Sequence, residues 1–136
     1  MSTSDTKNDS AQLPLSGRQV LVVEDDSDTR HILAFVLEQN GAQVVAVEAV
    51  EPALEAFEKM NPDTVVADIG MPGYNGYALI AKIRELDRKK LQRTKCVAVT
   101  AFATSTDRDT TLNAGFDAYV AKPFEPAELV RTVSSC

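Results

Sequence analysis

Polar residues follow several short apolar segments of the sequence. They are Glu24, Asp25, Asp68, Thr100 and Lys122. If the segments before Asp25 and Asp68 form neighbouring strands, their carboxylates lie side by side and repel each other. A hard divalent cation with oxygen ligands, Mg²⁺ above all, relieves this repulsion and leaves positions open for a phosphoryl group. Asp25 and Asp68 are therefore the best ligand candidates, and the alternative is a solvated acidic rim without an ion.

The hydroxyl of Thr100 and the ammonium of Lys122 add donors to this set. A phosphoryl group on a carboxylate needs hydrogen-bond donors for its oxygens, and a hydroxyl and an ammonium from two sides of one crevice supply them. Each residue alone has an ordinary explanation, as a hydroxyl at a strand end or a surface lysine. Their placement after successive apolar segments favours one common site.

Five apolar segments that alternate with helical patterns are the expected strands. They are Val20 to Val23, Val44 to Val47, Val65 to Ala67, Val97 to Val99 and Ala118 to Ala121. Strands that are apolar almost throughout indicate a parallel sheet covered by helices on both faces. We predict a doubly wound α/β fold, in which ligands bind beyond the carboxyl ends of the strands.

The segments between the expected strands have helix signals. Apolar stripes at helical spacing are Leu33, Val36 and Leu37; Ala53, Leu54 and Phe57; Leu79, Ile83 and Leu86; and Leu129, Val130 and Val133. Gly41 is expected to close the first helix, and Pro126 is expected to begin the last one. The helix predicted over about 106 to 114 has little apolar content beyond Leu112, so we expect it to be the least firmly held.

Composition limits the possible functions. The chain has 136 residues, of which 44% are hydrophobic, and a net charge of -6 that disfavours nucleic acid and anionic membranes as partners. Cys96 and Cys136 are too far apart for a CxxC motif, which favours a reducing cytoplasm. No apolar run approaches the roughly 20 residues that span a bilayer. Residues 1–17 are polar and are predicted to form a flexible tail before a domain over 18–136.

Four motifs together resemble the signature of response-regulator receiver domains. They are VLVVEDD at 20 to 26, DIGMPG at 68 to 73, VAVTA at 97 to 101 and YVAKPF at 119 to 124. Each motif alone is weak, but their order and spacing are specific. The resemblance covers about residues 18 to 133 and implies a flavodoxin-like sheet of five parallel strands in the order 2-1-3-4-5.

The resemblance also implies a role for each site residue. Asp68 is expected to accept the phosphoryl group, and Glu24, Asp25, Asp68 and the backbone carbonyl of Gly70 are expected to hold Mg²⁺. Lys122 is expected to pair with the acidic site and the phosphoryl oxygens. Asp26 is assigned no role.

The expected output is a switch of a protein-binding surface. By the same resemblance, Thr100 hydrogen-bonds the phosphoryl group and Tyr119 turns inward; a half-buried tyrosine without a signalling role is the alternative. His31, the one histidine, suits a surface position, so the phosphoryl group is expected to come from another protein or a small-molecule donor. The resemblance implies a sensor histidine kinase or a histidine phosphotransfer protein as that donor. A homodimer through the fourth helix, fifth strand and fifth helix is possible, and the downstream partner is open.

Three other functions are compared with this expectation. A phosphatase of the haloacid dehalogenase kind needs a second acid two positions after the nucleophile, where this chain has Gly70. A nucleotide-binding flavodoxin needs a Gly-, Ser- or Thr-rich loop after the first strand, which here is acidic. A receiver-like interaction module that is not phosphorylated stays open, as does the choice between a stand-alone regulator and a receiver from a hybrid kinase.

Overall fold

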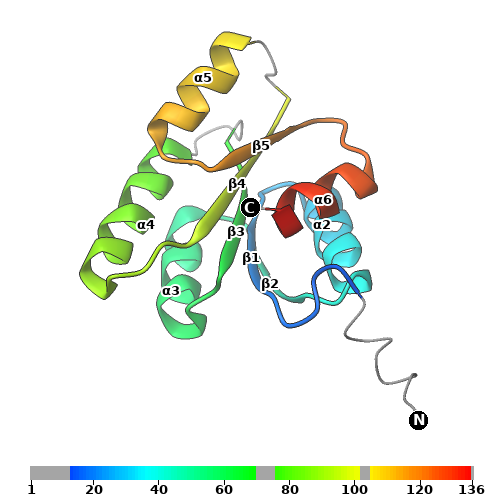
Figure 1. Ribbon diagram of the computed structural model, residues 1–136, viewed down its shortest axis with the longest axis horizontal. Helices are drawn as coiled ribbons and strands as arrows, with labels where there is room; N and C mark the ends of the chain where they lie inside the picture. The colour runs from blue at the N-terminus through cyan, green and yellow to red at the C-terminus, as the bar shows by residue number, and fades with distance from the viewer. Residues whose placement is uncertain (1–12, 70–75, 102–104, 136) are drawn as a thin grey trace.

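The computed structural model describes residues 13–69, 76–101 and 105–135. In chain order the elements are β1 (Gln19–Val23), α2 (Ser27–Gln39), β2 (Gln43–Val47), α3 (Val50–Met60), β3 (Thr64–Asp68), α4 (Gly76–Lys90), β4 (Lys95–Thr100), α5 (Ser105–Ala114), β5 (Ala118–Ala121) and α6 (Pro126–Ser135). The strands form one five-stranded parallel sheet in the order β2-β1-β3-β4-β5 (Figure 1). The predicted fold class and strand order are confirmed.

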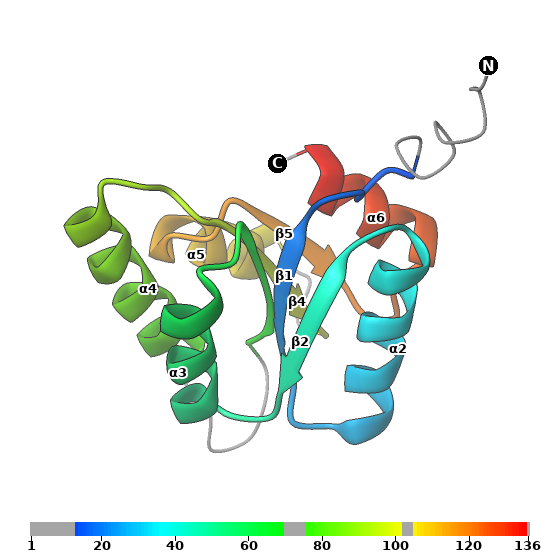
Figure 2. The same ribbon diagram turned by 90° about the horizontal axis from the view of Figure 1, so that it is seen from below.

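Helices cover both faces of the sheet. Figure 2 shows α2 and α6 on one side and α3, α4 and α5 on the other. Alternate residues of each strand face opposite ways, so Val20 and Val22 pack in one core with α2 and α6, whereas Leu21 and Val23 pack in the other with α3 and α4. Burial on both faces explains why these strands are apolar along their whole length.

The domain begins earlier than the sequence predicts. Leu15 is fully buried in the core beside Leu33 and Leu37, and its backbone N–H donates to the carbonyl of Asn40 at 2.8 Å. At Gly41, where φ is 105°, a Cβ would lie 2.9 Å from the Ser16 nitrogen, so the close approach of this segment needs glycine. The residues from 13 to 17 therefore pack on the domain, while residues 1–12 of the predicted tail lie outside the described residues.

Helix α5 differs from the other helices in how it is anchored. Leu112 is exposed, whereas Thr111 is fully buried. The Thr111 hydroxyl donates to the Asp107 carbonyl at 2.8 Å and lies 3.4 Å from the hydroxyl of Tyr77. Gly115 follows the helix with φ 126°, as its predicted closing role requires. A polar buried contact in place of an apolar stripe agrees with the expectation that this helix is weakly held.

A buried ionic network lies at the amino end of β4. The guanidinium of Arg84 contacts the carboxylates of Asp87 at 3.0 Å and Asp117 at 2.9 Å, and it donates to the carbonyls of Thr94 at 2.6 Å and Gly115 at 2.7 Å. Asp87 also accepts hydrogen bonds from the backbone N–H and the hydroxyl of Thr94. The network joins α4 to the loops before β4 and β5, so it supports the sheet from the end opposite Asp68.

Candidate functional site

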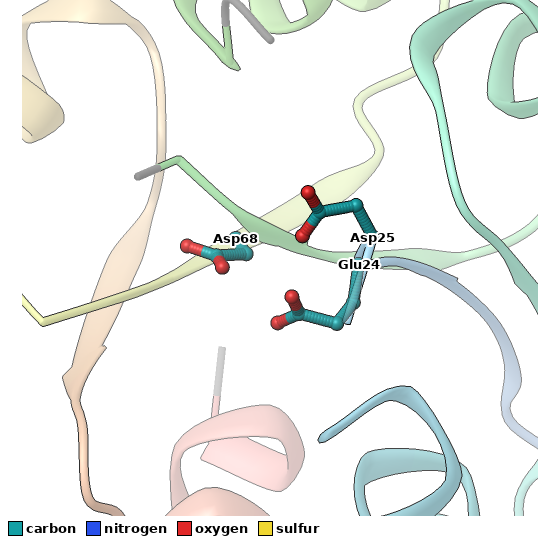
Figure 3. Close-up of side chains that lie close together, drawn as sticks. All are labelled: Glu24, Asp25 and Asp68. Carbon is teal, nitrogen blue, oxygen red and sulfur yellow. The ribbon is translucent and has the colours of Figure 1, made fainter. Parts of the chain in front are cut away.

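Three carboxylates meet at the carboxyl ends of β1 and β3. These strands are neighbours, with Val23 paired to Ala67, so Glu24 and Asp25 leave β1 beside Asp68 at the end of β3. One ligand oxygen from each of the three residues lies within 4.8 Å of the others. Figure 3 shows the three side chains close together. Glu24 and Asp68 are buried and Asp25 is exposed. The structure therefore brings together the three side chains that the sequence predicts as metal ligands.

Lys122 adds a cation to this cluster from the end of β5. Its Nζ donates to Asp68 Oδ2 at 2.8 Å and to Glu24 Oε1 at 3.1 Å. The Glu24 and Asp68 side chains are almost inaccessible to solvent, and the lysine is partly exposed. The ammonium thus bridges two buried carboxylates that would otherwise repel each other.

The charge states of Glu24 and Lys122 reflect this crowding. Burial, with repulsion from Asp68 as a smaller contribution, raises the pKa of Glu24 to about 7, although hydrogen bonds from Asp26 and Lys122 oppose the rise. Burial alone would lower the pKa of Lys122, but its hydrogen bonds to Asp68 and Glu24 outweigh that effect and raise it. A buried, crowded carboxylate of this kind fits an Mg²⁺ site, since oxygen ligands and a shortage of positive charge are what a hard cation needs.

Asp26 and Arg30 shape the acidic loop and were missed as contributors by the sequence prediction. Asp26 is the N-cap of α2. Its Oδ2 accepts from the Thr29 hydroxyl at 2.7 Å and from the Thr29 N–H at 2.9 Å, and both bonds lower the pKa of Asp26. The Asp26 N–H donates to Glu24 Oε2 at 3.2 Å. Arg30 Nη1 donates to the backbone carbonyls of Glu24 at 2.9 Å and Asp25 at 3.3 Å. The acid-x-x-Thr spacing before an apolar stripe is a readable capping signal. No comparable signal marks Arg30.

Thr100 and Tyr119 lie on neighbouring strands. Thr100 ends β4 and is fully buried, and Tyr119 on β5 is half-buried and pairs with Ala98. Because strand side chains alternate, Thr100 faces the same side as Ala98, so Thr100 and Tyr119 are diagonal neighbours on the face covered by α4 and α5. The guanidinium of Arg108 lies over the Tyr119 ring at 5.5 Å from its centroid. Gly70 lies outside the described residues.

The sequence model of the response regulator receiver domain matches residues 20–134. The chain belongs to the response regulator receiver family. This match covers β1 from Val20 onward, the other four strands and every predicted site residue. It decides against a phosphatase of the haloacid dehalogenase kind and against a nucleotide-binding flavodoxin, because it assigns the chain to another family, that of signalling receiver domains.

Relatives of this receiver domain include proteins of similar and of greater length. It is 40% identical over 119 residues to an uncharacterised 14.6 kDa protein of Leptolyngbya boryana, with 88% of this chain and 89% of that protein covered. It is 38% identical to the phosphate regulon transcriptional regulatory protein PhoB of Escherichia coli, with 87% of this chain and 51% of PhoB covered. The chain thus spans about half the length of PhoB.

Solved receiver domains have the same fold. The Francisella response regulator 1452 receiver domain is 27% identical with a TM-score of 0.76, covering 88% of this chain and 95% of that one. The beryllofluoride-activated DrrB receiver domain is also 27% identical, with a TM-score of 0.75 and coverage of 87% and 95%. Receiver domains interact with histidine kinases or phosphotransfer proteins and typically bind Mg²⁺. None of the helices in the described part of this receiver domain has the length and apolar character that crossing a membrane requires.

The raised pKa of Glu24 predicts how stability depends on pH. The folded state binds the Glu24 proton more tightly than the unfolded state, so this stabilisation is present below pH 4.5 and is lost as the pH rises through about 7. The free energy of unfolding in EDTA should fall by about 2 kcal/mol between pH 5 and pH 7.5. Urea unfolding at several pH values measures this slope.

Two variants and added Mg²⁺ test whether Glu24 causes this change of the free energy of unfolding with pH. Glu24→Gln should flatten the slope, since the amide does not titrate, and saturating Mg²⁺ should flatten it by stabilising the ionised carboxylate. Glu38→Gln, at an exposed position of α2, should keep the wild-type slope. An unchanged slope in Glu24→Gln would assign the pH dependence to other groups.

Proposed function

We propose that this receiver domain accepts a phosphoryl group on Asp68 with the help of Mg²⁺ and thereby changes the surface that it offers to a partner protein. The main support is the pair of contacts by which Lys122 holds the Asp68 and Glu24 carboxylates beside each other. The Asp68 carboxylate is fixed at the carboxyl end of β3, in contact with the Lys122 ammonium. This arrangement suits its attack on a phosphorus atom.

The chemical roles follow from the positions of the side chains. A carboxylate oxygen of Asp68 forms a bond to phosphorus while the bond from phosphorus to the donor histidine nitrogen breaks, and the released imidazole takes up a proton. Glu24, Asp25 and Asp68, with the Gly70 carbonyl as a further proposed ligand, would hold Mg²⁺, which would neutralise negative charge on the phosphoryl oxygens. Lys122 stays within reach of those oxygens and stabilises the negative charge.

We place the donor among the sensor histidine kinases and histidine phosphotransfer proteins, and the reaction in the cytoplasm. The family supports this choice of donor, since receiver domains interact with such proteins. His31 is exposed on α2 and is not among the acidic cluster, which agrees with an external donor.

We propose Thr100 and Tyr119 as the switch residues. The phosphoryl group adds three acceptor oxygens at Asp68, which draw the Thr100 hydroxyl toward them, and the diagonal neighbour Tyr119 moves into the space that is left. Arg108 stacks on Tyr119, so this movement would reach α5 directly. The face formed by α5, β5 and α6 is then the proposed surface for a partner protein or a second copy of the chain.

Intact mass spectrometry after incubation with acetyl phosphate and Mg²⁺ tests the reaction. Wild type should gain the mass of one phosphoryl group, and the adduct should be lost at alkaline pH as an acyl phosphate is. Asp68→Asn should gain none, because an amide is not a nucleophile at neutral pH. Thr100→Ala should still be labelled, since its hydroxyl acts after transfer.

The matched control is Asp109→Asn, at an exposed acid of α5, which should be labelled like wild type. Stoichiometric labelling of Asp68→Asn would place the acceptor elsewhere. Absence of any adduct on wild type would favour the receiver-like module that is not regulated by phosphorylation.

A further inference from the structure

The turn between α4 and β4 concentrates positive charge on an acidic protein. The cations are Arg88, Lys89, Lys90, Arg93 and Lys95, within a run that contains no acid. The rest of the chain has 20 acidic residues against nine basic ones. Lys95 begins β4, so this cationic turn (residues 88–95) lies at the amino end of the parallel sheet, opposite Asp68 at its carboxyl end.

Leu91 projects from the centre of the cationic turn. Its side chain is 93% exposed, and its backbone has a left-handed φ of 55°. A left-handed conformation is unfavourable for a residue with a Cβ, and glycine or asparagine usually occupies this position after a helix. The chain therefore holds a large apolar side chain in water, in a backbone conformation that leucine disfavours.

Hydrogen bonds to Asp87, on the last turn of α4, hold the turn around Leu91 in place. The buried Asp87 carboxylate accepts from the N–H and hydroxyl of Thr94 at 2.9 and 2.8 Å and from Nε2 of Gln92 at 3.1 Å. The Gln92 N–H also donates to the Asp87 carbonyl at 3.0 Å. Leu91 is thus presented in a fixed position, which lowers the entropic cost of binding through it.

A hollow of about 490 Å³ lies beside the turn. Its lining includes the cations Arg18, Arg93 and Lys95 and one acid, Asp63, and Arg93 is paired with the Asp117 carboxylate at 2.5 Å. Arg18 is fixed by hydrogen bonds to the carbonyls of Val133 and Ser134 at the end of α6, both at 3.0 Å. Lys95 forms no ion pair with any residue that the structure describes. Lys95 thus offers a positive charge to a carboxylate-sized group in a hollow whose lining includes Gln92, the residue after Leu91.

We infer that the cationic turn is a docking site for an acidic segment of a partner protein, whose carboxylates contact the cations and whose apolar side chain packs on Leu91. A short acidic segment fits the size of the turn and its hollow. An extended polyanion, such as a nucleic acid or a membrane surface, would also meet the acidic remainder of the protein within a Debye length of about 8 Å. The exposed leucine adds affinity for a protein segment with an apolar side chain, but it adds none for nucleic acid.

Titration of the ¹⁵N-labelled chain with a synthetic peptide tests this site. The probe is a capped peptide of glutamates with one central leucine, compared with the same peptide carrying serine at the centre, at physiological salt. Amide shifts should concentrate in residues 88–95, and the leucine peptide should bind about fivefold more tightly than the serine peptide. Amide shifts spread over the whole surface, or equal affinity for the two peptides, would overturn the site.

Two variants separate docking from folding. Leu91→Gly should weaken the leucine peptide about fivefold while raising the thermal midpoint, because glycine suits the left-handed backbone. Lys89→Glu with Lys90→Glu should weaken binding about tenfold, whereas Lys59→Glu on α3 should change it little. If Leu91→Gly bound the leucine peptide as tightly as wild type does, Leu91 would make no apolar contact with the ligand.

Two further probes examine the other polyanions. Single-stranded DNA and phosphatidylserine vesicles should bind at least about tenfold more weakly than the leucine peptide, and tighter binding of either would replace the acidic segment as the ligand. Labelling of Asp68 by acetyl phosphate should be the same in all these variants. Failure of docking and failure of phosphorylation are therefore distinguishable.

Discussion

Replacing Lys122 with methionine should destabilise the metal-free protein by about 3 kcal/mol, measured by urea unfolding in EDTA at pH 8. The ammonium contacts Asp68 at 2.8 Å and Glu24 at 3.1 Å, and both carboxylates are buried. Removing one partner of a buried ion pair costs about 3 to 5 kcal/mol, because the remaining charge has no counterion. The partial exposure of Lys122 places the expected loss at the lower end of that range.

The same variant should respond more strongly to pH and to Mg²⁺ than wild type does. Without the ammonium, the pKa of Glu24 should rise further, so the loss of stability should be smaller at pH 6, where Glu24 can be protonated. Mg²⁺ should recover most of the loss, since it supplies positive charge to the same carboxylates.

A matched lysine elsewhere provides the control for this prediction. Lys59→Met, at an exposed position of α3, should change the free energy of unfolding by less than about 0.5 kcal/mol. If Lys122→Met were as stable as wild type in EDTA, the lysine would contribute nothing to the site at rest. If Mg²⁺ stabilised Lys122→Met and wild type equally, the carboxylates that Lys122 contacts would not be the metal ligands.

Replacing Arg84 with methionine should lower the free energy of unfolding by about 4 kcal/mol and the thermal midpoint by on the order of 15 °C. Methionine retains a long apolar stem but leaves Asp87 and Asp117 without the guanidinium that lies between them. The Gly115 carbonyl also loses its bonds from Nε at 3.1 Å and Nη2 at 2.7 Å. Thermal and urea unfolding by circular dichroism measure both quantities.

Arg84→Lys should recover only part of this loss, because an ammonium cannot reach all four acceptors that the guanidinium bonds in one plane. Arg88→Met, one turn further along α4 and exposed, should have almost no effect. Equal effects at the two arginines would mean that the network contributes no more to stability than surface charge does.

Local patterns in the sequence were sufficient to predict the architecture. The five apolar segments became β1 to β5, and polar residues directly after them came together at one edge because parallel strands end on the same side. Glu24, Asp25 and Asp68 form a cluster for that reason. Which segments form strands, and which residues follow each strand at its carboxyl end, depend on short-range pattern. A single sequence therefore carries enough information to predict both.

Tertiary structure decided which charged side chains meet. The resemblance implied that Lys122 pairs with the acidic site, but only the structure decided that it bonds Glu24, 98 positions away, together with Asp68. Arg84 likewise reaches Asp117 across 33 positions. A long side chain can reach many acceptors, and only the packed positions of distant elements select among them. For the same reason, the sequence did not predict that Arg30 donates to the Glu24 carbonyl in the acidic loop.

Tertiary structure also decided the limits of the core. Leu15 stands in a polar stretch whose composition predicts a tail, yet it is fully buried because the end of α2 and Gly41 leave room for the segment to pack. In α5 the apolar Leu112 is exposed and the polar Thr111 is buried, since the helix turns Thr111 toward Tyr77 on α4. Composition measures the average tendency of a segment to be buried, whereas the neighbouring elements determine which of its side chains find a cavity to fill.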